Sequence, residues 1–378
     1  MNKSTLHEMF RCETKTQIPR SIWLPALLRW ALVLAVLIVP QAARALEWHA
    51  IVGAQGNDKG RQALAFLPNE IWIHAGDSIT WTFDVDEVHT VTFIPDSEPR
   101  PFFQTITGSP SGSQFPDPTK PETTVVSSPG QLPDIPGTTD PALVKGVPPV
   151  TFTVNFPTAG NFKQVCLFHQ NMTGVVHVLP ADAPLPHNQD FYDREAADQR
   201  RDLLSDRDGR SVAACGECAA HDSLKARVVT AGTGEISATA GGTQTLAVMR
   251  FLADQISIRA GDTVEWTNQN PVEPHTVTFG TVPFVPGLSP FPDDLTKHPD
   301  PDGALHAVIN SNADNVSSGI IAAAAQDPGS GMGSQTPLGP TRFRATFPNP
   351  GVFHYLCLLH DGLGMKGTVM VFPKVPPQ

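Results

Sequence analysis

Cysteine and methionine are both scarce in this chain: its 378 residues include five cysteines and seven methionines. The methionines form no cluster and the thiols are few, which disfavours a metal-storage protein that binds its cargo through many sulfur ligands. No His-x-His pair occurs, so the sequence lacks the closely spaced imidazoles that a multinuclear catalytic metal cluster needs. Any metal chemistry is therefore expected in isolated sites with few ligands.

A short apolar run near the N-terminus has the features of an export signal. Residues 31–39 (ALVLAVLIV) follow a basic stretch and are too few to span a bilayer by themselves. The A-x-A sequence at 43–45 predicts cleavage, so residues 1–45 are interpreted as a signal peptide and the protein as periplasmic or secreted. The alternative is an uncleaved anchor extended back to Leu24, against which Arg29 argues. No Arg-Arg pair precedes the run, so twin-arginine export is not indicated.

Basic residues are outnumbered, with 26 Lys and Arg against 37 Asp and Glu, which gives a formal net charge of -11. Cleavage of residues 1–45 would remove six basic and two acidic residues and take the net charge to -15. So acidic a protein is a poor ligand for nucleic acid and for anionic membranes, and no stable membrane insertion is expected after cleavage. The charge suits a basic protein partner, although solubility alone explains it equally well.

The sequence contains an internal repeat. Residues 66–93 and 251–279 share Ala-Gly-Asp, a Trp five residues after the Gly, and His-Thr-Val-Thr-Phe. The offset between the copies is 185 residues at the Gly, 186 at the His and 191 at the cysteine that follows. A drifting offset indicates duplicated domains with loop insertions. We therefore predict two domains, at 46–180 and 226–378, joined by a linker at 181–225.

Within each repeat the residues alternate as in β-strands. Residues 150–156 (VTFTVNF) place Val and Phe on one face and Thr and Asn on the other, and residues 343–347 (FRATF) repeat this pattern. Short strands separated by turns predict an all-β fold with one Greek-key β-sandwich per domain. The long insertions at 97–149 and 283–340 are rich in Pro, Ser, Thr and Gly and are expected to be mostly irregular, with a short helix at 317–326.

The linker is predicted to be partly helical. Residues 190–208 are charged and contain no Pro, which favours a helix that packs on one sandwich. Its thin apolar stripe is expected to consist of Phe191, Ala197 and Leu203/Leu204.

Two short loops each combine one thiolate, one imidazole and one thioether. Residues 355–365 (YLCLLHDGLGM) form one loop, and residues 165–172 (VCLFHQNM) form a looser copy of it. A second imidazole is available to each loop from His-Thr-Val-Thr-Phe. The two sets of predicted metal ligands are His89, Cys166, His169 and Met172, and His275, Cys357, His360 and Met365. Two imidazoles and one thiolate with a distant thioether describe a blue-copper electron-transfer centre.

Both repeats resemble cupredoxins of the plastocyanin and amicyanin type. The spacing Cys357-x2-His360-x4-Met365 is similar to plastocyanin and pseudoazurin, and the shorter first loop is similar to amicyanin. The resemblance implies one type 1 copper ion per domain, two in all. It also implies that the loop imidazole of each domain lies under a small exposed hydrophobic patch, for which 167–168 and 358–359 are the candidates. The expected partner is a redox protein such as a basic cytochrome.

A copper enzyme and a copper carrier without redox function are the alternatives. Nitrite reductases and multicopper oxidases also combine cupredoxin units, but they have a His beside the copper-binding Cys. Here Leu follows both Cys166 and Cys357, which favours an electron carrier without catalytic residues. Storage or delivery of copper remains as a third function. An oxidised protein that is intensely blue and bleaches with ascorbate would support electron transfer.

The pair Cys215-Gly-Glu-Cys218, followed by His221, belongs to neither loop. The spacing is not that of a haem attachment site. Three interpretations stay open: a local disulfide, a further metal site that uses both thiolates and His221, and a redox-active pair.

Overall fold

The computed structural model describes residues 45–101, 108–128, 150–205, 227–280, 296–323 and 340–374. The predicted signal peptide lies outside the described residues, apart from Ala45. The strands of the first half are β1 (Glu47–Gln55), β2 (Arg61–Leu67), β3 (Glu70–His74), β4 (Ser78–Phe83), β5 (Thr92–Phe93), β6 (Ser113–Gln114), β7 (Val126–Ser127), β8 (Val150–Asn155), β9 (Gly160–Val165) and β10 (Thr173–Leu179). Those of the second half are β11 (Arg227–Ala238), β12 (Thr243–Leu252), β13 (Gln255–Arg259), β14 (Thr263–Gln269), β15 (Thr278–Phe279), β16 (His298–Pro299), β17 (Leu305–Val308), β18 (Val316–Ser317), β19 (Arg342–Thr346), β20 (Gly351–Leu356) and β21 (Lys366–Phe372).

Each half has its own five-stranded sheet, and the two sheets have equivalent orders. The first runs β3-β10-β9-β5-β7 and the second β13-β21-β20-β15-β18. In both, the strand that precedes a metal-loop cysteine pairs with the strand that follows the loop. The alternation expected from the sequence is confirmed: Phe152 and Val154 are buried in β8, and Phe343 and Ala345 in β19. The prediction of an all-β fold with two packed sheets in each half is confirmed.

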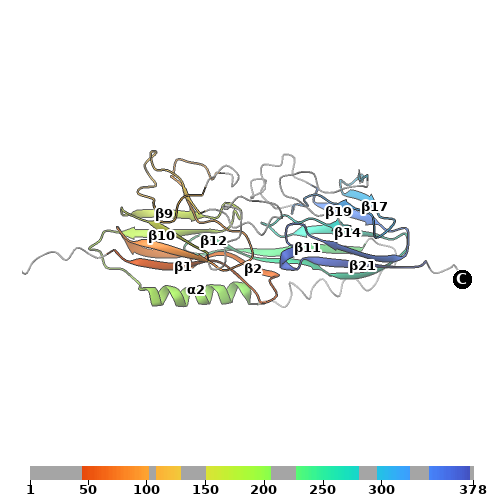
Figure 1. Cartoon of the computed structure of the whole chain (residues 1–378), viewed down its shortest axis with the longest axis horizontal. Coiled ribbons are helices and arrows are strands. Elements are labelled where there is room, and N and C mark those ends of the chain that lie inside the picture. The colour runs from red at the N-terminus through yellow and green to blue at the C-terminus, as the bar shows by residue number, and fades with distance from the viewer. Residues whose placement is uncertain are drawn as a thin grey trace, which may run out of the picture. The chain divides into compact units, whose positions relative to one another are not determined.

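The opposite layer is one sheet that runs through both halves (Figure 1). Its order is β16-β17-β19-β14-β11-β12-β2-β1-β4-β8-β6, and the halves meet where β12 pairs antiparallel with β2, with Leu246 opposite Ala63. Pairing of these two strands satisfies backbone groups that would otherwise form exposed sheet edges. The sequence did not predict this shared sheet. The division into domains at 46–180 and 226–378 stays a prediction, since strands of both ranges form the sheet.

The hydrophobic core also crosses between the halves. Trp81 and Phe93 are fully buried in the first core, and Trp266 and Phe343 in the second. Leu363 of the second metal loop nevertheless packs into the first core. The two metal loops are therefore placed by one continuous packing arrangement.

The predicted linker helix is present as α2 (Gln189–Leu204), which packs on β1 and β2 (Figure 1). Its N-cap is Asn188, whose side chain accepts a hydrogen bond from the backbone of Phe191. The predicted apolar stripe is partly wrong: the buried positions are Tyr192, Ala196 and Leu203. No helix in the described ranges is long and apolar enough to cross a membrane.

The two insertions contain short strands in their described parts. β6 and β7 lie in the first insertion, and β16, β17 and β18 in the second. The helix expected at 317–326 is wrong for its described part, because Val316–Ser317 is a strand and Ile321 forms an isolated bridge with His275. The second insertion therefore pairs with the strand region that carries a predicted metal ligand.

Candidate metal centres

Each metal loop is a tight connection between two paired strands. Cys166 follows β9, and its backbone N–H donates to the carbonyl of Met172 at 3.0 Å. Cys357 follows β20, and its N–H donates to the carbonyl of Met365 at 3.0 Å. The second loop is longer and includes a 3₁₀ turn at Asp361–Leu363. The hydrogen bond that closes each loop keeps its Cys and its Met at the same end of the sandwich.

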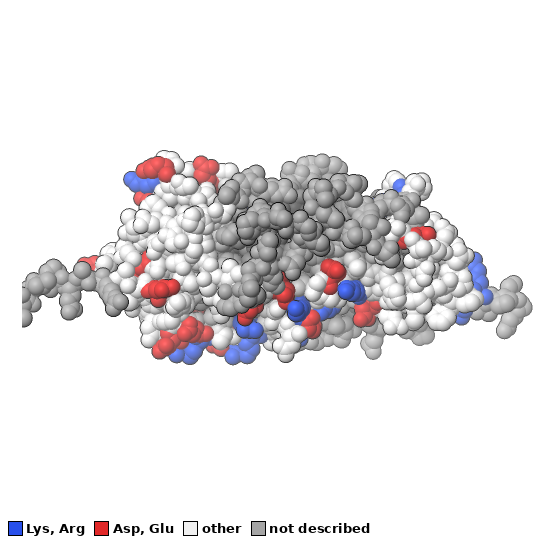
Figure 2. Space-filling view, in the orientation of Figure 1, with Lys and Arg blue, Asp and Glu red and all other residues white. Residues whose placement is uncertain are grey.

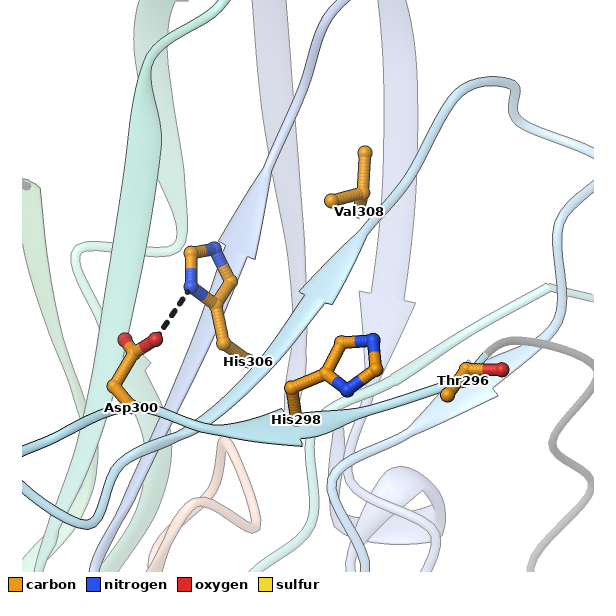
Figure 3. A pocket seen from close by; sticks show the side chains of 5 residues that line it. All are labelled: Thr296, His298, Asp300, His306 and Val308. Atoms are coloured by element: carbon orange, nitrogen blue, oxygen red, sulfur yellow. Dashed lines mark hydrogen bonds and ion pairs between the residues drawn. The ribbon is translucent and has the colours of Figure 1, made fainter.

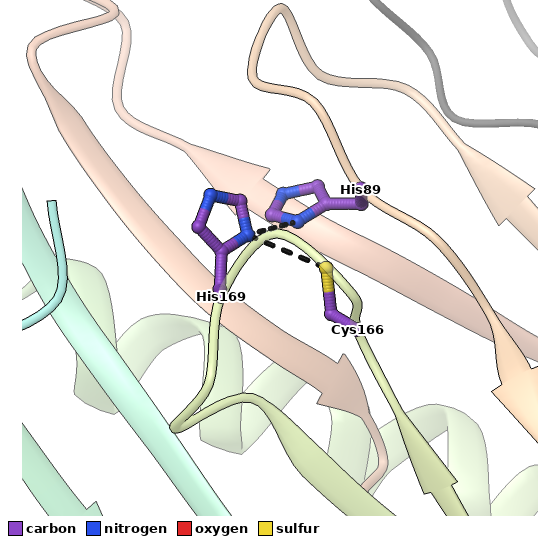
Figure 4. A group of neighbouring side chains, drawn as sticks. All are labelled: His89, Cys166 and His169. Carbon is purple, nitrogen blue, oxygen red and sulfur yellow. Dashed lines mark hydrogen bonds between the residues drawn. The ribbon is translucent and has the colours of Figure 1, made fainter. Parts of the chain in front are cut away.

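The first loop and β4–β5 connection bring His89, Cys166 and His169 together (Figure 4). The Nδ1 atoms of the two imidazoles are 3.1 Å apart, and Cys166 Sγ lies 3.5 Å from His169 Nδ1. All three side chains are buried, and Met172 is fully buried beside them in the loop. The group has the donors of a trigonal His2Cys site.

The second loop forms the same group from His275, Cys357 and His360. The imidazole Nδ1 atoms are again 3.1 Å apart, and Cys357 Sγ lies 3.4 Å from His360 Nδ1 and 3.9 Å from His275 Nδ1. These side chains and Met365 are buried. Both sets of residues predicted from the sequence thus lie together, each in its own half; their role as ligands stays a prediction.

A threonine in each His-Thr-Val-Thr-Phe motif braces the thiolate. The backbone N–H of Thr90 donates to Cys166 Sγ at 3.4 Å, and its Oγ1 accepts from Leu167 N at 2.8 Å. Thr276 makes the same pair of contacts, with Cys357 at 3.4 Å and the next residue at 2.8 Å. Sequence reasoning assigned these threonines no role, although their identity in both copies of the motif was a usable signal.

A glycine makes room for the imidazole that lies outside the metal loop in each half. Gly53 has φ +71° at a bulge in β1, and a Cβ there would lie 2.5 Å from His89 Nε2. Gly232 has φ +74° at the equivalent bulge in β11, and a Cβ there would overlap the His275 ring. A left-handed φ and the closeness of the ring both favour glycine at these positions.

The electrostatics of both groups favour a thiolate. Burial raises the pKa of the Cys166 thiol, but the positive charge of His169 and hydrogen bonds from His169 and His89 outweigh burial and hold this pKa well below its usual range. At Cys357 the same opposition from His360 and His275 also lowers the pKa well below its usual range. The thiolate is the form of cysteine that binds a metal ion.

The loop imidazoles are not exposed, which corrects the expectation of an accessible histidine under a hydrophobic patch. His169 is 2% exposed and His360 4% exposed. Leu167 is buried, and Leu359 packs against the second core. Both loop imidazoles instead lie beside Glu273 of the second half.

Glu273 lies between the two loop imidazoles. Its Oε1 is 3.0 Å from His169 Nε2, and its Oε2 is 3.6 Å from His360 Nε2. Burial raises the pKa of this carboxyl, but His169 and His360 outweigh burial and the pKa is lowered. Glu87 is a further buried carboxylate, with Oε1 3.8 Å from His169 Nε2. Sequence reasoning missed both glutamates, although each stands two residues before a predicted strand-borne ligand.

Arginines hold the two loops from outside. Arg100 donates to the carbonyl of His169 at 2.9 Å and to that of Gln170 at 2.8 Å. Arg250 donates to the carbonyl of Leu363 at 2.6 Å and also to the carbonyl of Asp58 in the first half. The second loop is thus tied to both halves of the chain.

A surface pocket at the end of the shared sheet also gathers histidines (Figure 3). His298 and His306 are cross-strand partners in β16 and β17, although their spacing in the sequence is not that of metal ligands. His306 uses both ring nitrogens, one toward Asp300 at 3.1 Å and one toward Thr346 at 2.8 Å. Asp300 also pairs with Arg344 at 2.8 Å. His306 and Asp300 thus belong to an ion-pair network with Arg344.

The pair Cys215 and Cys218, with His221, lies outside the described residues. Among the described residues, the cysteines are Cys166 and Cys357, and both are free thiols.

Comparison with known proteins identifies the fold of the second half. No curated protein sequence matches this chain. Among the solved structures that resemble it is a mutant plastocyanin of a fern, with 21% identity over 38% of this chain and 99% of that chain and a TM-score of 0.20. A Cu-containing nitrite reductase (NirK) from Thermus scotoductus SA-01 is 13% identical over 87% of this chain and 68% of that chain, with a TM-score of 0.22. The resemblance predicted from the metal loops is confirmed by sequence: residues 238–372 match the family model of the copper binding proteins of the plastocyanin/azurin family.

Proposed function

We propose that this is an exported blue copper protein that transfers single electrons through two type 1 copper centres. The ligands of the first centre are His89, Cys166, His169 and Met172. Those of the second are His275, Cys357, His360 and Met365. A bound copper ion supplies a one-electron couple between Cu(I) and Cu(II).

The observation that carries the proposal is the duplication of one buried group. In both halves two imidazole Nδ1 atoms stand 3.1 Å apart next to a cysteine sulfur. Imidazole and thiolate are ligands that suit copper, and a thioether as a weak further ligand is typical of blue-copper sites. Because the pKa of Cys166 and that of Cys357 are both lowered, these side chains are available as thiolates. The residues present therefore fit copper.

The protein's contribution is to hold these ligands in place. In each half one imidazole comes from the connection beside a short strand, and the other ligands come from one loop closed by backbone hydrogen bonds. Thr90 and Thr276 fix the sulfur atoms through their N–H groups. Ligands that are buried and held by hydrogen bonds move little when the bound metal ion gains or loses an electron. A small change in ligand geometry favours fast electron transfer.

Electron entry through an exposed loop imidazole is not part of this proposal, because both loop imidazoles are buried. The partner is proposed to be a redox protein that docks elsewhere. Acidic and basic side chains are mixed over α2 in the view of Figure 2. Attraction of a basic partner on that face would therefore depend on local charges as well as on the net charge, which is -11 for the whole chain and -15 after cleavage of residues 1–45.

Copper stoichiometry with visible and paramagnetic resonance spectra tests the proposal. Wild-type protein should bind two copper ions, be intensely blue when oxidised and bleach with ascorbate. Cys166→Ser and Cys357→Ser should each lose the thiolate-dependent absorption of one centre and keep that of the other. A copper-loaded protein without colour would contradict electron transfer through type 1 centres.

A copper oxidoreductase is the second candidate function. Glu87, Glu273 and His360 form a further buried group whose ligand atoms lie within 4.8 Å of one another. Carboxylates and an imidazole could hold a metal with an open position, which catalysis would require. A type 2 signal in paramagnetic resonance, in addition to the two type 1 signals, would favour this function.

A further inference from the structure

The two candidate copper centres face each other through their loop imidazoles. In each of these rings Nδ1 belongs to the metal group, and Nε2 points away from it toward Glu273. Each carboxylate oxygen faces a different ring, with Oε1 at 3.0 Å from His169 and Oε2 at 3.6 Å from His360. One side chain of the second half thus reaches a predicted ligand of each half.

The carboxylate is held in this position by its own loop. The side chain of Asn270 accepts hydrogen bonds from the backbone N–H of Glu273 and of Val272, both at 3.1 Å. The side chain of Asn268 donates to the carbonyl of Glu273 at 2.8 Å. These contacts fix the backbone on both sides of the residue. The carboxylate is therefore placed by the fold before any metal binds.

Burial makes this arrangement costly without partners. Glu273 is 5% exposed, and removing a carboxylate from water costs several kcal/mol unless cationic or donor groups compensate. The compensating groups here are the two imidazoles. Glu87, the equivalent residue of the first repeat, is directed differently: its Oε1 accepts from Val88 N at 3.1 Å and lies 3.8 Å from His169.

We infer that Glu273 is a positioning residue shared by both copper centres. An imidazole that binds metal through Nδ1 carries its proton on Nε2, and a carboxylate that accepts this proton fixes the ring and makes the metal-binding nitrogen more basic. Glu273 is placed to do this for both rings, with Oε1 3.0 Å from His169 Nε2 and Oε2 3.6 Å from His360 Nε2. This inference rests on the proposed function, because it assumes that both groups bind copper.

Glu273→Gln tests the inference, with Glu87→Gln as the matched control. Gln keeps the size of the side chain and removes its charge. Loss of an outer partner of this kind weakens metal binding about 10-fold or more. Glu273→Gln should therefore weaken Cu(II) binding at both centres by about 10-fold and raise both midpoint potentials. Glu87→Gln removes an equal charge near the same two rings and should alter both centres by much less, because Glu87 Oε1 lies 3.8 Å from His169 Nε2 and already accepts from Val88 N.

Metal-free protein gives a measurement that does not depend on copper. Nitrogen resonances of the two imidazoles should both shift in Glu273→Gln and stay near wild type in Glu87→Gln. If that variant does not fold, contacts between the Glu273 side chain and the Nε2 protons of both rings in wild-type spectra decide the question. If wild-type protein binds no copper, the proposed function is wrong. The spectra of the metal-free protein would still show whether Glu273 contacts both imidazoles.

Two results would overturn the inference. A response of only one imidazole and one centre would show that Glu273 is not shared. A third copper ion in wild-type protein that is lost in Glu273→Gln would make the carboxylate a metal ligand. It would also support the oxidoreductase.

Discussion

Replacing Gly53 by alanine should remove copper from the first centre and leave the second one loaded. The new Cβ would lie 2.5 Å from His89 Nε2 and 2.7 Å from Cδ2, and real Cβ contacts essentially never fall under 3.0 Å. The ring must therefore move by about 0.5 Å or more, which reaches the tolerance of about 0.5 Å within which a binding site must hold its ligands. Val85 Cγ2, at 3.0 Å from the same position, leaves little room for the methyl group to move the other way.

The expected cost in stability has two parts. A left-handed φ costs a non-glycine residue about 1–2 kcal/mol, and an inserted methyl group in a packed site costs about 1–3 kcal/mol more. Metal-free Gly53→Ala should therefore unfold with a free energy about 2–5 kcal/mol below that of wild type. The sum is small enough for the protein to be purified and titrated with copper.

Gly76→Ala is the control that separates the two parts. Gly76 also has a left-handed φ, +97°, but nothing lies within 4 Å of a Cβ there. This variant should lose only about 1–2 kcal/mol and should bind copper at both centres. The assay is copper stoichiometry with visible spectra, together with denaturant unfolding of the metal-free proteins. Wild-type copper affinity at both centres in Gly53→Ala would refute the reasoning.

Two further predictions concern a thiolate brace and an ion-pair network. Thr276→Val should destabilise the protein by about 1–3 kcal/mol, because Leu358 N–H is left without its buried acceptor. The variant should also shift the absorption of the second centre. An unchanged absorption spectrum together with an unchanged unfolding midpoint would contradict this prediction. Arg344 lowers the pKa of Asp300 mainly through a hydrogen bond, with burial opposing it. Arg344 also holds the pKa of Asp302 well below its usual range. A lowered carboxyl pKa contributes stability above the pKa of the unfolded state, and this stability is lost as the pH falls through the folded pKa. Arg344→Met should therefore lower the thermal midpoint at pH 7, and much less at an acid pH where Asp300 and Asp302 are both protonated. An equal loss at both pH values would point to packing instead.

The sequence was sufficient to predict which His and Cys residues lie together, because the loop residues are adjacent and the second imidazole belongs to a repeated motif. Cys357 and His360 are three residues apart on one loop, and His275 was identified by a motif that occurs twice. Strand positions such as Phe152 were predicted because alternation is a property of the strand itself. Features that depend on one segment and its own periodicity could thus be predicted from one sequence.

The helix stripe was partly wrong because its contacts come from distant strands. Hydrophobicity favoured Phe191 and Ala197, whereas Tyr192 and Ala196 are buried. Tyr192 can be buried because its hydroxyl accepts from the backbone N–H of Trp72 at 2.8 Å. Burial raises the pKa of this hydroxyl to about 12, so it stays neutral. A tyrosine is buried at low cost only if its hydroxyl has a hydrogen-bond partner. Here that partner, Trp72, lies 120 positions away in the sequence.

The burial of the loop imidazoles follows from the pairing of β2 with β12. A cupredoxin domain with free edges could expose its loop histidine, and the expectation from the sequence assumed such a domain. Here strand pairing and side-chain contacts such as that of Thr173 with Thr243 at 3.1 Å fix the halves against each other. His169 and His360 are then enclosed, and a carboxylate between them compensates their burial. The same contact that prevents either imidazole from meeting an external partner therefore brings the two centres into reach of Glu273.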